Sequence, residues 1–125
     1  MRRRVIRVKG PKKILGHLTA RDFKANKKKA YALIMDRIAH FNQSGEFPVG
    51  KVFIKNQKTR WGSCSGKRNL NFNYKLLFLP ENLRDYIIIH ELCHLKEMNH
   101  SQNFWNLVSQ KVPDYKALRR QIKLY

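Results

Sequence analysis

The stretch PENLRDYIIIHELCHLKEMNH, residues 80–100, carries the strongest pattern in this chain. Its first part predicts a helix over about 81–98, because Pro80 suits a helix start, Glu81 stands in the first turn and apolar residues recur at helical spacing. Its second part holds three of the five histidines of the chain. The stretch is therefore either a metal site built on a helix or an ordinary helix end that is rich in histidine.

The segment HELCH, residues 90–94, favours the metal site. Positions i and i+4 of a helix share one face at a separation of roughly 5–6 Å, so the imidazoles of His90 and His94 can reach one zinc ion. Glu91 stands beside that face, where it can take a proton from a water molecule. The alternative is a helix with two polar surface histidines, and the apolar run before His90 argues against it. We therefore expect one zinc ion, with Glu91 as a catalytic base.

The third ligand of this site is less determined. His100 is the first candidate, because it follows His94 after the same gap as in HExxHxxGxxH sites. Those sites reverse the chain at a glycine, whereas Glu97 stands at that position here. We expect Asn99 to adopt a left-handed conformation and to make the turn instead. Glu97 and Asp114 are the alternative ligands, and Asp114 can also orient a ligating imidazole.

Three protein ligands leave one coordination position of zinc open, whereas four ligands close the site. Cys93 is a candidate fourth ligand, but it points away from the helix face that the two histidines share. Cys93 and Cys64 form no CxxC pair, so we expect two reduced thiols in or near the core. The expected site is therefore of the open type.

The chain has 125 residues, enough for one domain, and a formal charge of +19. Residues 1–60 carry 17 Lys and Arg against three acids, and residues 61–125 carry 10 against five. The basic N-terminal half suggests a polyanion partner, most simply nucleic acid, with a solvated basic surface as the alternative. No apolar run approaches the roughly 20 residues of a membrane span, and the N-terminus lacks the apolar segment of a secretory signal. We therefore expect no membrane partner and a cytoplasmic location.

The remaining patterns predict an α+β domain that follows a basic extension. Residues 1–18 are expected to form a basic arm or a short hairpin, and residues 19–125 form the domain. Thr19 and Asp22 resemble a capping box at the start of an N-terminal helix. A small antiparallel sheet with a hairpin follows, then the HELCH helix and two C-terminal helices that begin after Ser101 and Asp114. The expected boundaries are a helix at 20–43, a strand at 51–55, a hairpin of 58–64 with 69–73, and a last helix at 115–124.

Several motifs, in the right order, carry a resemblance to a known family. They are TRWGSCS at 59–65, LNFN at 70–73, LPENLRDYIIIHE at 79–91, HELCHLKEMNHSQNFW at 90–105 and VPDY at 112–115. With these motifs the chain resembles the YgjP-like family of zinc metallopeptidases, which is allied to the SprT-like and minimal gluzincin-type peptidases. The resemblance implies a minimal zincin-like domain, with His90, His94 and His100 as zinc ligands and Glu91 as the base.

The RWGSC segment and a few residues beyond it are candidates for contact with a substrate. Gly62 permits a close backbone approach or a bulge. Trp61 is expected to pack over the metal helix, and Arg60 to meet an acidic partner or a substrate carboxylate; the alternative for both is a structural hairpin with Trp61 in the core. Asn73 and Tyr115 are further candidates, as donors to a developing oxyanion.

Two functions from different classes remain open on the sequence. The first is a zinc peptidase with protein or peptide substrates, and the alliance with SprT-like proteins suggests substrates that are associated with nucleic acid. The second is a basic nucleic-acid-binding module with a structural zinc ion and no hydrolytic activity. The number of protein ligands on the metal discriminates between them.

Overall fold

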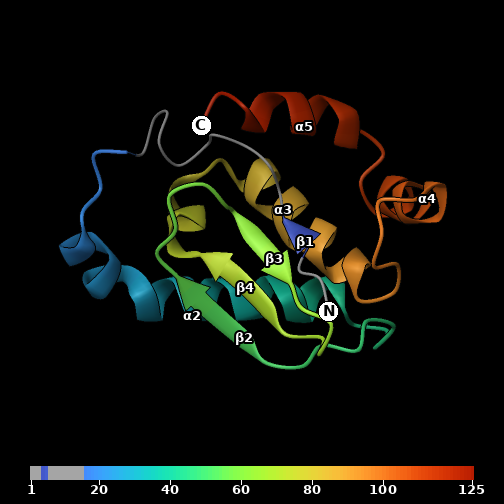
Figure 1. Ribbon diagram of the computed structural model, residues 1–125, viewed down its shortest axis with the longest axis horizontal. Coiled ribbons are helices and arrows are strands. Elements are labelled where there is room, and N and C mark those ends of the chain that lie inside the picture. The colour runs from blue at the N-terminus through green and yellow to red at the C-terminus, as the bar shows by residue number, and fades with distance from the viewer. Residues whose placement is uncertain (1–3, 6–15) are drawn as a thin grey trace.

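The computed structural model describes residues 4–5 and 16–125, in which four α-helices and one 3-10 helix pack around a small sheet (Figure 1). This architecture confirms the predicted α+β class. In chain order the elements are β1 (Arg4–Val5), α2 (Ala20–Phe41), β2 (Val52–Lys55), β3 (Gly62–Cys64), β4 (Leu70–Asn73), η1 (Tyr74–Phe78), α3 (Glu81–His94), α4 (Gln102–Lys111) and α5 (Tyr115–Ile122).

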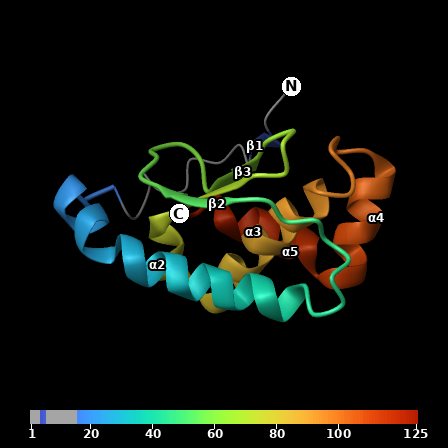
Figure 2. The same ribbon diagram turned by 90° about the horizontal axis from the view of Figure 1, so that it is seen from below.

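Helix α2 begins at the predicted capping box. The backbone N–H of Thr19 donates to Oδ2 of Asp22 over 2.7 Å, and the backbone N–H of Asp22 donates to Oγ1 of Thr19 over 3.4 Å. The buried residues of α2 are Ala30, Ile34 and Ile38, which recur at helical spacing. This buried stripe faces the sheet and α3, so α2 underlies one face of the sheet (Figure 2).

The sheet is mixed, so the prediction of an antiparallel sheet is wrong for one pair of strands. The strand order is β1-β3-β4-β2, in which β3 and β4 are antiparallel and β2 and β4 are parallel. The connection after β2 and the β3–β4 hairpin reverse the chain twice, which returns β4 to the direction of β2. Alternating hydrophobicity predicts that a strand exists but not which strand lies beside it, and the parallel pair was therefore not visible in the sequence.

The predicted hairpin is confirmed, although its first strand is shorter than expected. The predicted strand 58–64 is reduced to Gly62–Cys64, because a side chain binds the preceding backbone. The amide nitrogen of Asn73 donates to the carbonyl oxygens of Gln57 and Arg60 over 2.7 and 2.9 Å. In the turn of the hairpin, Arg68 has a φ of 65°.

Helix α3 forms the centre of the molecule. Every residue from Tyr86 to His94 is buried. On its outer side the guanidinium of Arg37 donates to both carboxylate oxygens of Asp85, over 3.1 and 3.0 Å, and this pair ties α2 to α3. The helix ends at His94, four residues before the predicted end at residue 98.

The prediction for residues 1–18 falls mostly on residues that the structure does not describe. Of this segment, Arg4–Val5 pairs antiparallel with β3. A domain that begins at residue 19 stays a prediction. Among residues 4–5 and 16–125, no helix combines the length and the apolar character that a bilayer span requires.

Candidate metal centre

Three histidines meet where the end of α3 faces the start of α4. Nε2 of His100 lies 3.0 Å from Nε2 of His94 and 3.4 Å from Nε2 of His90. One ligand nitrogen of each histidine lies within 4.8 Å of the others. His90 and His94 are buried on α3, whereas His100 is exposed in the loop between α3 and α4. The helical spacing and the loop therefore bring the three imidazoles to one point, as predicted.

The spacing of these nitrogens fits a zinc ion. In a tetrahedral site with Zn–N distances of about 2.0–2.1 Å, two ligand nitrogens lie about 3.3 Å apart. The observed separations of 3.0 and 3.4 Å agree with that value. Imidazole nitrogens are also a donor set that zinc prefers. Among the described residues, this group holds three possible ligands and no fourth.

The partners of the other ring nitrogens leave Nε2 available on both helical histidines. Nδ1 of His94 lies 3.1 Å from the backbone carbonyl oxygen of Glu97, which accepts a hydrogen bond only if Nδ1 carries the proton. Nδ1 of His90 lies 3.4 Å from the hydroxyl of Tyr86. The protonated Nδ1 of His94 leaves the lone pair of its Nε2 for a metal, and the hydroxyl of Tyr86, which can donate or accept, is compatible with the same tautomer of His90.

The turn that returns His100 to the metal position is not the predicted one. Among the described non-glycine residues, Arg68 alone has a positive φ, so Asn99 does not adopt the left-handed conformation. Instead α3 ends early: the N–H of Glu97 donates to the carbonyl of Cys93 over 2.9 Å, and the chain reverses between His94 and α4. Ending the helix at His94 leaves enough residues for a wide turn, so the turn needs no left-handed residue.

Aromatic rings from α4 line the back of the histidine cluster. The ring of Phe104 is stacked on His94 with centroids 4.3 Å apart, and Trp105 is stacked on His100 with centroids 5.6 Å apart. Ser101 positions this helix, since its Oγ accepts a hydrogen bond from the N–H of Phe104 over 3.3 Å, as predicted for an N-cap. The exposed ligand from the loop is thus held against a ring of the adjacent helix.

The carboxyl group of Glu91, next to His90 in the chain, is fully buried, and neither oxygen has a hydrogen-bond partner among the residues that the structure describes. Strand β3 passes close to it. A Cβ atom at Gly62 would lie 3.2 Å from Cγ of Glu91 and 3.1 Å from the carbonyl oxygen of Asn71. This confirms that Gly62 allows a close backbone approach, and it shows that the approach is to Glu91 itself.

Burial shifts the protonation of the site residues. Desolvation, followed by the charges of His94, His100 and Arg119, lowers the pKa of His90 well below its usual value, which keeps the imidazole in the neutral, metal-binding form. Desolvation also raises the pKa of Glu91 well above the usual value of a carboxyl group. A bound divalent cation opposes that shift, because a nearby positive charge favours the carboxylate.

Comparison with known proteins agrees with this geometry. The sequence model of the YgjP-like metallopeptidase domain matches residues 10–125. The chain belongs to the YgjP-like family. It is accordingly a metallopeptidase, and its three-histidine group is suited to one zinc ion.

Two solved structures resemble this YgjP-like domain. The crystal structure of the metallopeptidase zymogen of Pyrococcus abyssi abylysin has a TM-score of 0.58 and 28% sequence identity, and the match covers 71% of this chain and 87% of that one. The crystal structure of the metallopeptidase zymogen of Methanocaldococcus jannaschii jannalysin has a TM-score of 0.61 and 27% identity, over 71% and 92% of the two chains. No curated protein sequence matches the chain. This chain is therefore similar in fold to these two metallopeptidases.

Other residues predicted for the site of this YgjP-like chain have structural partners. Trp61 is fully buried in the core. The amide of Asn73 is also buried, and it is committed to Gln57 and Arg60 through its nitrogen and to the N–H of Lys75 through its oxygen. Asn73 therefore positions the segment before β3. The role predicted for the half-buried side chain of Arg60 stays a prediction.

The residues predicted from the C-terminal part lie at the start of α5. Asp114 is exposed and occupies the N-cap position without a side-chain capping hydrogen bond. Tyr115 is stacked on Trp105, with ring centroids 5.3 Å apart. The partners seen for the helical histidines are Tyr86 and the Glu97 carbonyl, so the orienting role of Asp114 stays a prediction.

Three residues of the site were not found from the sequence. Tyr86 precedes His90 by one helical turn, and that spacing was an available signal. The stacking of Trp105 on His100 and the position of Arg119, whose guanidinium carbon lies 4.5 Å from the Trp105 ring centroid, depend on how α4 and α5 pack. No sequence pattern predicts that packing.

Both cysteines are buried and neither is part of a disulfide, as expected. Burial raises the pKa of the Cys93 thiol to about 12, so this thiol is protonated near neutral pH. A protonated thiol is neither a nucleophile nor a metal ligand, which agrees with a packing role for Cys93.

Proposed function

We propose that this chain hydrolyses peptide bonds with one zinc ion held by His90, His94 and His100 and with Glu91 as general base. The observation that carries the proposal is the convergence of three Nε2 atoms beside a buried carboxyl group that has no other partner. A bound zinc ion activates a water molecule and polarises the scissile carbonyl group.

Each protein residue has a defined task in this reaction. The Glu97 carbonyl holds His94 in the tautomer with a proton on Nδ1, and Tyr86 orients the imidazole of His90. Glu91 accepts a proton from the attacking water and delivers it to the leaving amine. Because no protein group competes for the Glu91 carboxyl oxygens, that carboxyl is free for both transfers.

The residues around Trp105 are the proposed wall of the substrate site. Tyr115 is stacked on Trp105, and the guanidinium of Arg119 lies over the same ring. Trp105 in turn is stacked on His100. A cation in this position favours substrates with a carboxylate or carbonyl oxygen close to the metal.

The test is the Glu91→Gln variant, measured for zinc content and for hydrolysis of an unstructured protein. The amide keeps the shape of the side chain but accepts no proton, so zinc is retained and the rate falls by about 10²–10⁴-fold. Glu81→Gln is the matched control, because Glu81 is an exposed glutamate on the same helix. Full activity of Glu91→Gln refutes the assigned base.

The alternative, a nucleic-acid-binding module with a structural zinc ion, is less well supported. A structural site has four protein ligands, and the described residues bring three to this cluster. The same Glu91→Gln experiment separates the two functions, because a structural site predicts no zinc-dependent hydrolysis in the unmodified protein either.

We also propose that the substrates are cytoplasmic proteins associated with nucleic acid. The charge of +19 supports a polyanion partner, and two buried cysteines that form no disulfide suit a reducing compartment. Single-stranded DNA is then expected to accelerate cleavage of a DNA-binding protein at low salt and not at high salt. Heparin is the control polyanion, and equal acceleration by heparin would contradict recognition of nucleic acid.

A further inference from the structure

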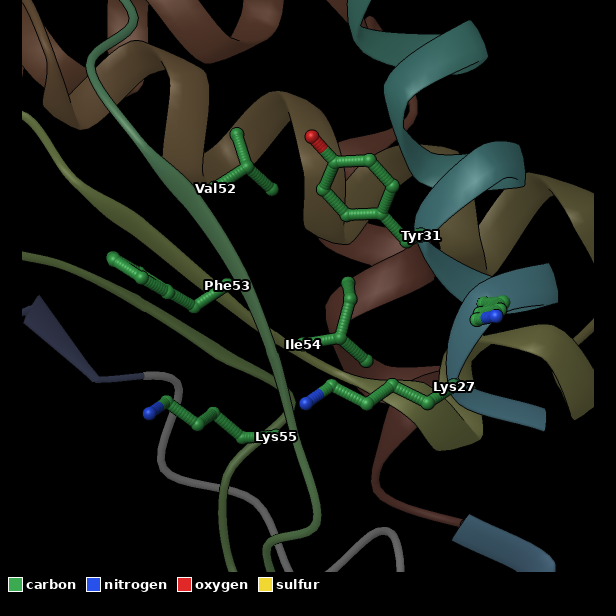
Figure 3. Close-up of a pocket in the computed structure, with 7 residues that line it drawn as sticks. Lys27, Tyr31, Val52, Phe53, Ile54 and Lys55 are labelled. Carbon is green, nitrogen blue, oxygen red and sulfur yellow. The ribbon is translucent and has the colours of Figure 1, made fainter. Parts of the chain in front are cut away.

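A groove lies between helix α2 and the outer strand β2, away from the metal centre. It is lined by Lys27, Lys28 and Tyr31 from α2 and by Val52, Phe53, Ile54 and Lys55 from β2. In Figure 3, Val52 and Ile54 point toward α2, whereas Phe53 and Lys55 point to the other side of β2. The groove has a volume of about 490 Å³. In the sheet, β4 separates β2 from β3, the strand that carries Gly62 beside Glu91. The groove is therefore distinct from the histidine cluster.

The charge of the groove is positive. Three of its seven lining residues are lysines, and none is acidic. In Figure 3 the side chain of Lys27 extends from α2 toward β2, and Lys55 extends from β2. A concave surface with several lysines and no carboxylate attracts an anion and concentrates it locally.

Two exposed aromatic rings lie at this edge of the sheet, Tyr31 on the α2 side of strand β2 and Phe53 on its other side, so a ligand that contacts both must cross the edge strand. Tyr31 is 46% exposed and Phe53 is 40% exposed, and they are two of the four exposed large apolar side chains among the described residues. The ammonium of Lys55 lies 5.4 Å from the centroid of the Phe53 ring. These rings do not pack in the core, and they neutralise no charge. Their exposure therefore favours a ligand with a flat apolar surface on which a ring can stack.

We propose that this groove binds single-stranded nucleic acid. Lys27, Lys28 and Lys55 neutralise phosphates, and Tyr31 and Phe53 stack on bases, which is the combination by which proteins hold single strands without sequence readout. This inference rests on the proposed function, because the groove would be the site at which the chain binds nucleic acid. Binding of nucleic acid in the groove does not depend on hydrolysis at the metal centre. The ligand is a single strand because the bases of a duplex are stacked on one another and do not offer their faces to side chains.

An acidic peptide is the competing occupant. Strand β2 is at the edge of the sheet, and an edge strand can accept a peptide as an additional strand. Such a peptide would satisfy the lysines and the strand edge but would leave the two exposed rings without a specific role. The aromatic residues therefore favour nucleic acid, and the peptide becomes an outcome of the test.

The first experiment measures binding of a fluorescent oligothymidylate to the full chain as a function of salt. The variant Lys27→Ala/Lys28→Ala is expected to weaken binding and to reduce the slope of log K against log salt by about 1.4, at about 0.7 for each single-strand phosphate that is no longer neutralised. Lys29→Ala/Lys116→Ala is the control: it removes the same charge from two exposed lysines outside the groove. An equal change in both variants overturns the proposal, because it shows a general effect of charge.

The second experiment tests the aromatic rings. Tyr31→Ala and Phe53→Ala are each expected to weaken binding of the oligothymidylate by about five-fold to a hundred-fold, the effect of one lost base stack. Phe78→Ala is the control, because Phe78 is 42% exposed and does not line the groove. Binding to duplex DNA should not respond to the aromatic variants. Losses no larger than that of Phe78→Ala overturn the proposal.

Two further measurements distinguish nucleic acid from an acidic peptide and the groove from the peptidase site. Poly-glutamate should compete poorly with the oligothymidylate; strong competition that Tyr31→Ala leaves unchanged identifies a site for acidic peptides and overturns the proposal. Hydrolysis of an unstructured protein without nucleic acid should be the same for Phe53→Ala and for the unmodified chain. Binding that persists in Glu91→Gln shows that the groove acts independently of the proposed peptidase reaction.

Discussion

The two halves of the histidine cluster are held in different ways. His90 and His94 are on α3, where they are buried among core residues, and they have only 4% and 0% exposure. His100 comes from the loop before α4 and is exposed. Its position depends on the stacked ring of Trp105 and on the turn that follows His94. The helical half is thus part of the core, whereas the loop half is assembled by a few local contacts.

This difference indicates which substitutions should lower metal affinity alone and which should also lower the stability of the fold. A substitution in the helical half removes core packing together with a ligand. A substitution in the loop half removes a ligand from a surface position, where the free energy of unfolding is less sensitive. Metal binding and stability are therefore separable at His100 and linked at His94.

The largest effect is expected from the loss of a ligand. His94→Ala and His100→Ala should each abolish hydrolysis and lower zinc affinity by more than about 100-fold. Loss of a residue that only orients a ligand lowers affinity by up to about 100-fold, and loss of the ligand itself should have a larger effect. In the metal-free protein, His94→Ala should also lower the free energy of unfolding by about 1–3 kcal/mol, because it leaves a buried partner unsatisfied. His100→Ala should change the free energy of unfolding of the metal-free protein by less than about 0.5 kcal/mol. Zinc titration and denaturant unfolding measure both quantities.

One control variant sharpens this comparison. His40→Ala removes an exposed histidine of α2 and should alter neither zinc affinity nor stability. If His100→Ala destabilised the metal-free protein as much as His94→Ala, the loop would be part of the core and the distinction between the two halves would be wrong.

The next effect is expected at Gly62, where β3 lies against the carboxyl group of Glu91, the proposed base. Gly62→Ala places a Cβ atom 3.2 Å from Cγ of Glu91, so the carboxyl must shift. We expect zinc to be retained and the hydrolytic rate to fall by less than about 100-fold, because that loss corresponds to a displacement of about 1 Å, whereas a contact of 3.2 Å requires a smaller shift. Zinc content and steady-state rates on an unstructured protein are the measurements.

Gly45→Ala is the matched control for Gly62→Ala. Gly45 has a φ of 75°, and a Cβ atom there would have no neighbour within 4 Å, so alanine strains the backbone without touching the site. It should lower stability by about 1–2 kcal/mol and leave the rate unchanged. A rate loss as large as that of Gly62→Ala would mean that destabilisation, and not the position of Glu91, controls activity.

A smaller effect is expected when the support of His100 is weakened. Trp105→Ala removes the stacked ring and should lower zinc affinity by about 10-fold, toward the low end of the effects of residues that orient a ligand. Trp105→Phe keeps an aromatic ring and should restore most of the affinity. Competition with a zinc-binding dye measures both variants, and an unchanged affinity in Trp105→Ala would show that the turn alone holds His100.

The smallest effect is expected from Glu46, which connects both ends of the segment that carries His100. Its carboxylate accepts hydrogen bonds from Lys111 of α4 and, over 3.2 Å, from Lys96 just after α3. These lysines, Lys111 first, hold the pKa of Glu46 below its ordinary value. Because the folded-state pKa is depressed, the stabilisation is complete above about pH 4.3, the unfolded value, and is lost as the pH falls through the folded value.

Glu46→Gln should therefore lower the free energy of unfolding by less than about 1 kcal/mol at neutral pH, as expected for partly exposed ion pairs. At a pH below the folded-state pKa, where the carboxyl is protonated in both states, the variant and the unmodified chain should be equally stable. Denaturant unfolding at the two pH values measures the difference. A difference that grows as the pH falls would contradict the assigned ion pairs.

The positions of the residues in the helical half could be predicted from the sequence, whereas their roles as zinc ligands and base stay predictions. Two histidines four residues apart share a helix face wherever the helix forms, so His90, Glu91 and His94 follow from local geometry. The choice of His100 agreed with the structure, but the turn expected before it was wrong, because Asn99 is not left-handed. The end of a helix depends on where the next segment must go, which local patterns do not contain.

In the fold, too, features set by local sequence could be predicted, whereas contacts between separate elements could not. The capping box of α2 and the Ser101 cap of α4 are local signals, and both are present. The parallel pairing of β2 with β4 and the stacking of Trp105 on His100 depend on how separate elements are arranged in space. Periodicity predicts which face of an element is buried but not which element covers it, and these contacts required the structure.

The most direct test of the metal centre is the position of zinc in crystals of the zinc-loaded protein, located by anomalous diffraction at the zinc edge. We expect one zinc ion bound to Nε2 of His90, His94 and His100, with Glu91 beside the remaining coordination position. Zinc bound by two of these histidines together with other protein groups, or closed off by a fourth protein ligand, would contradict the proposed catalytic site.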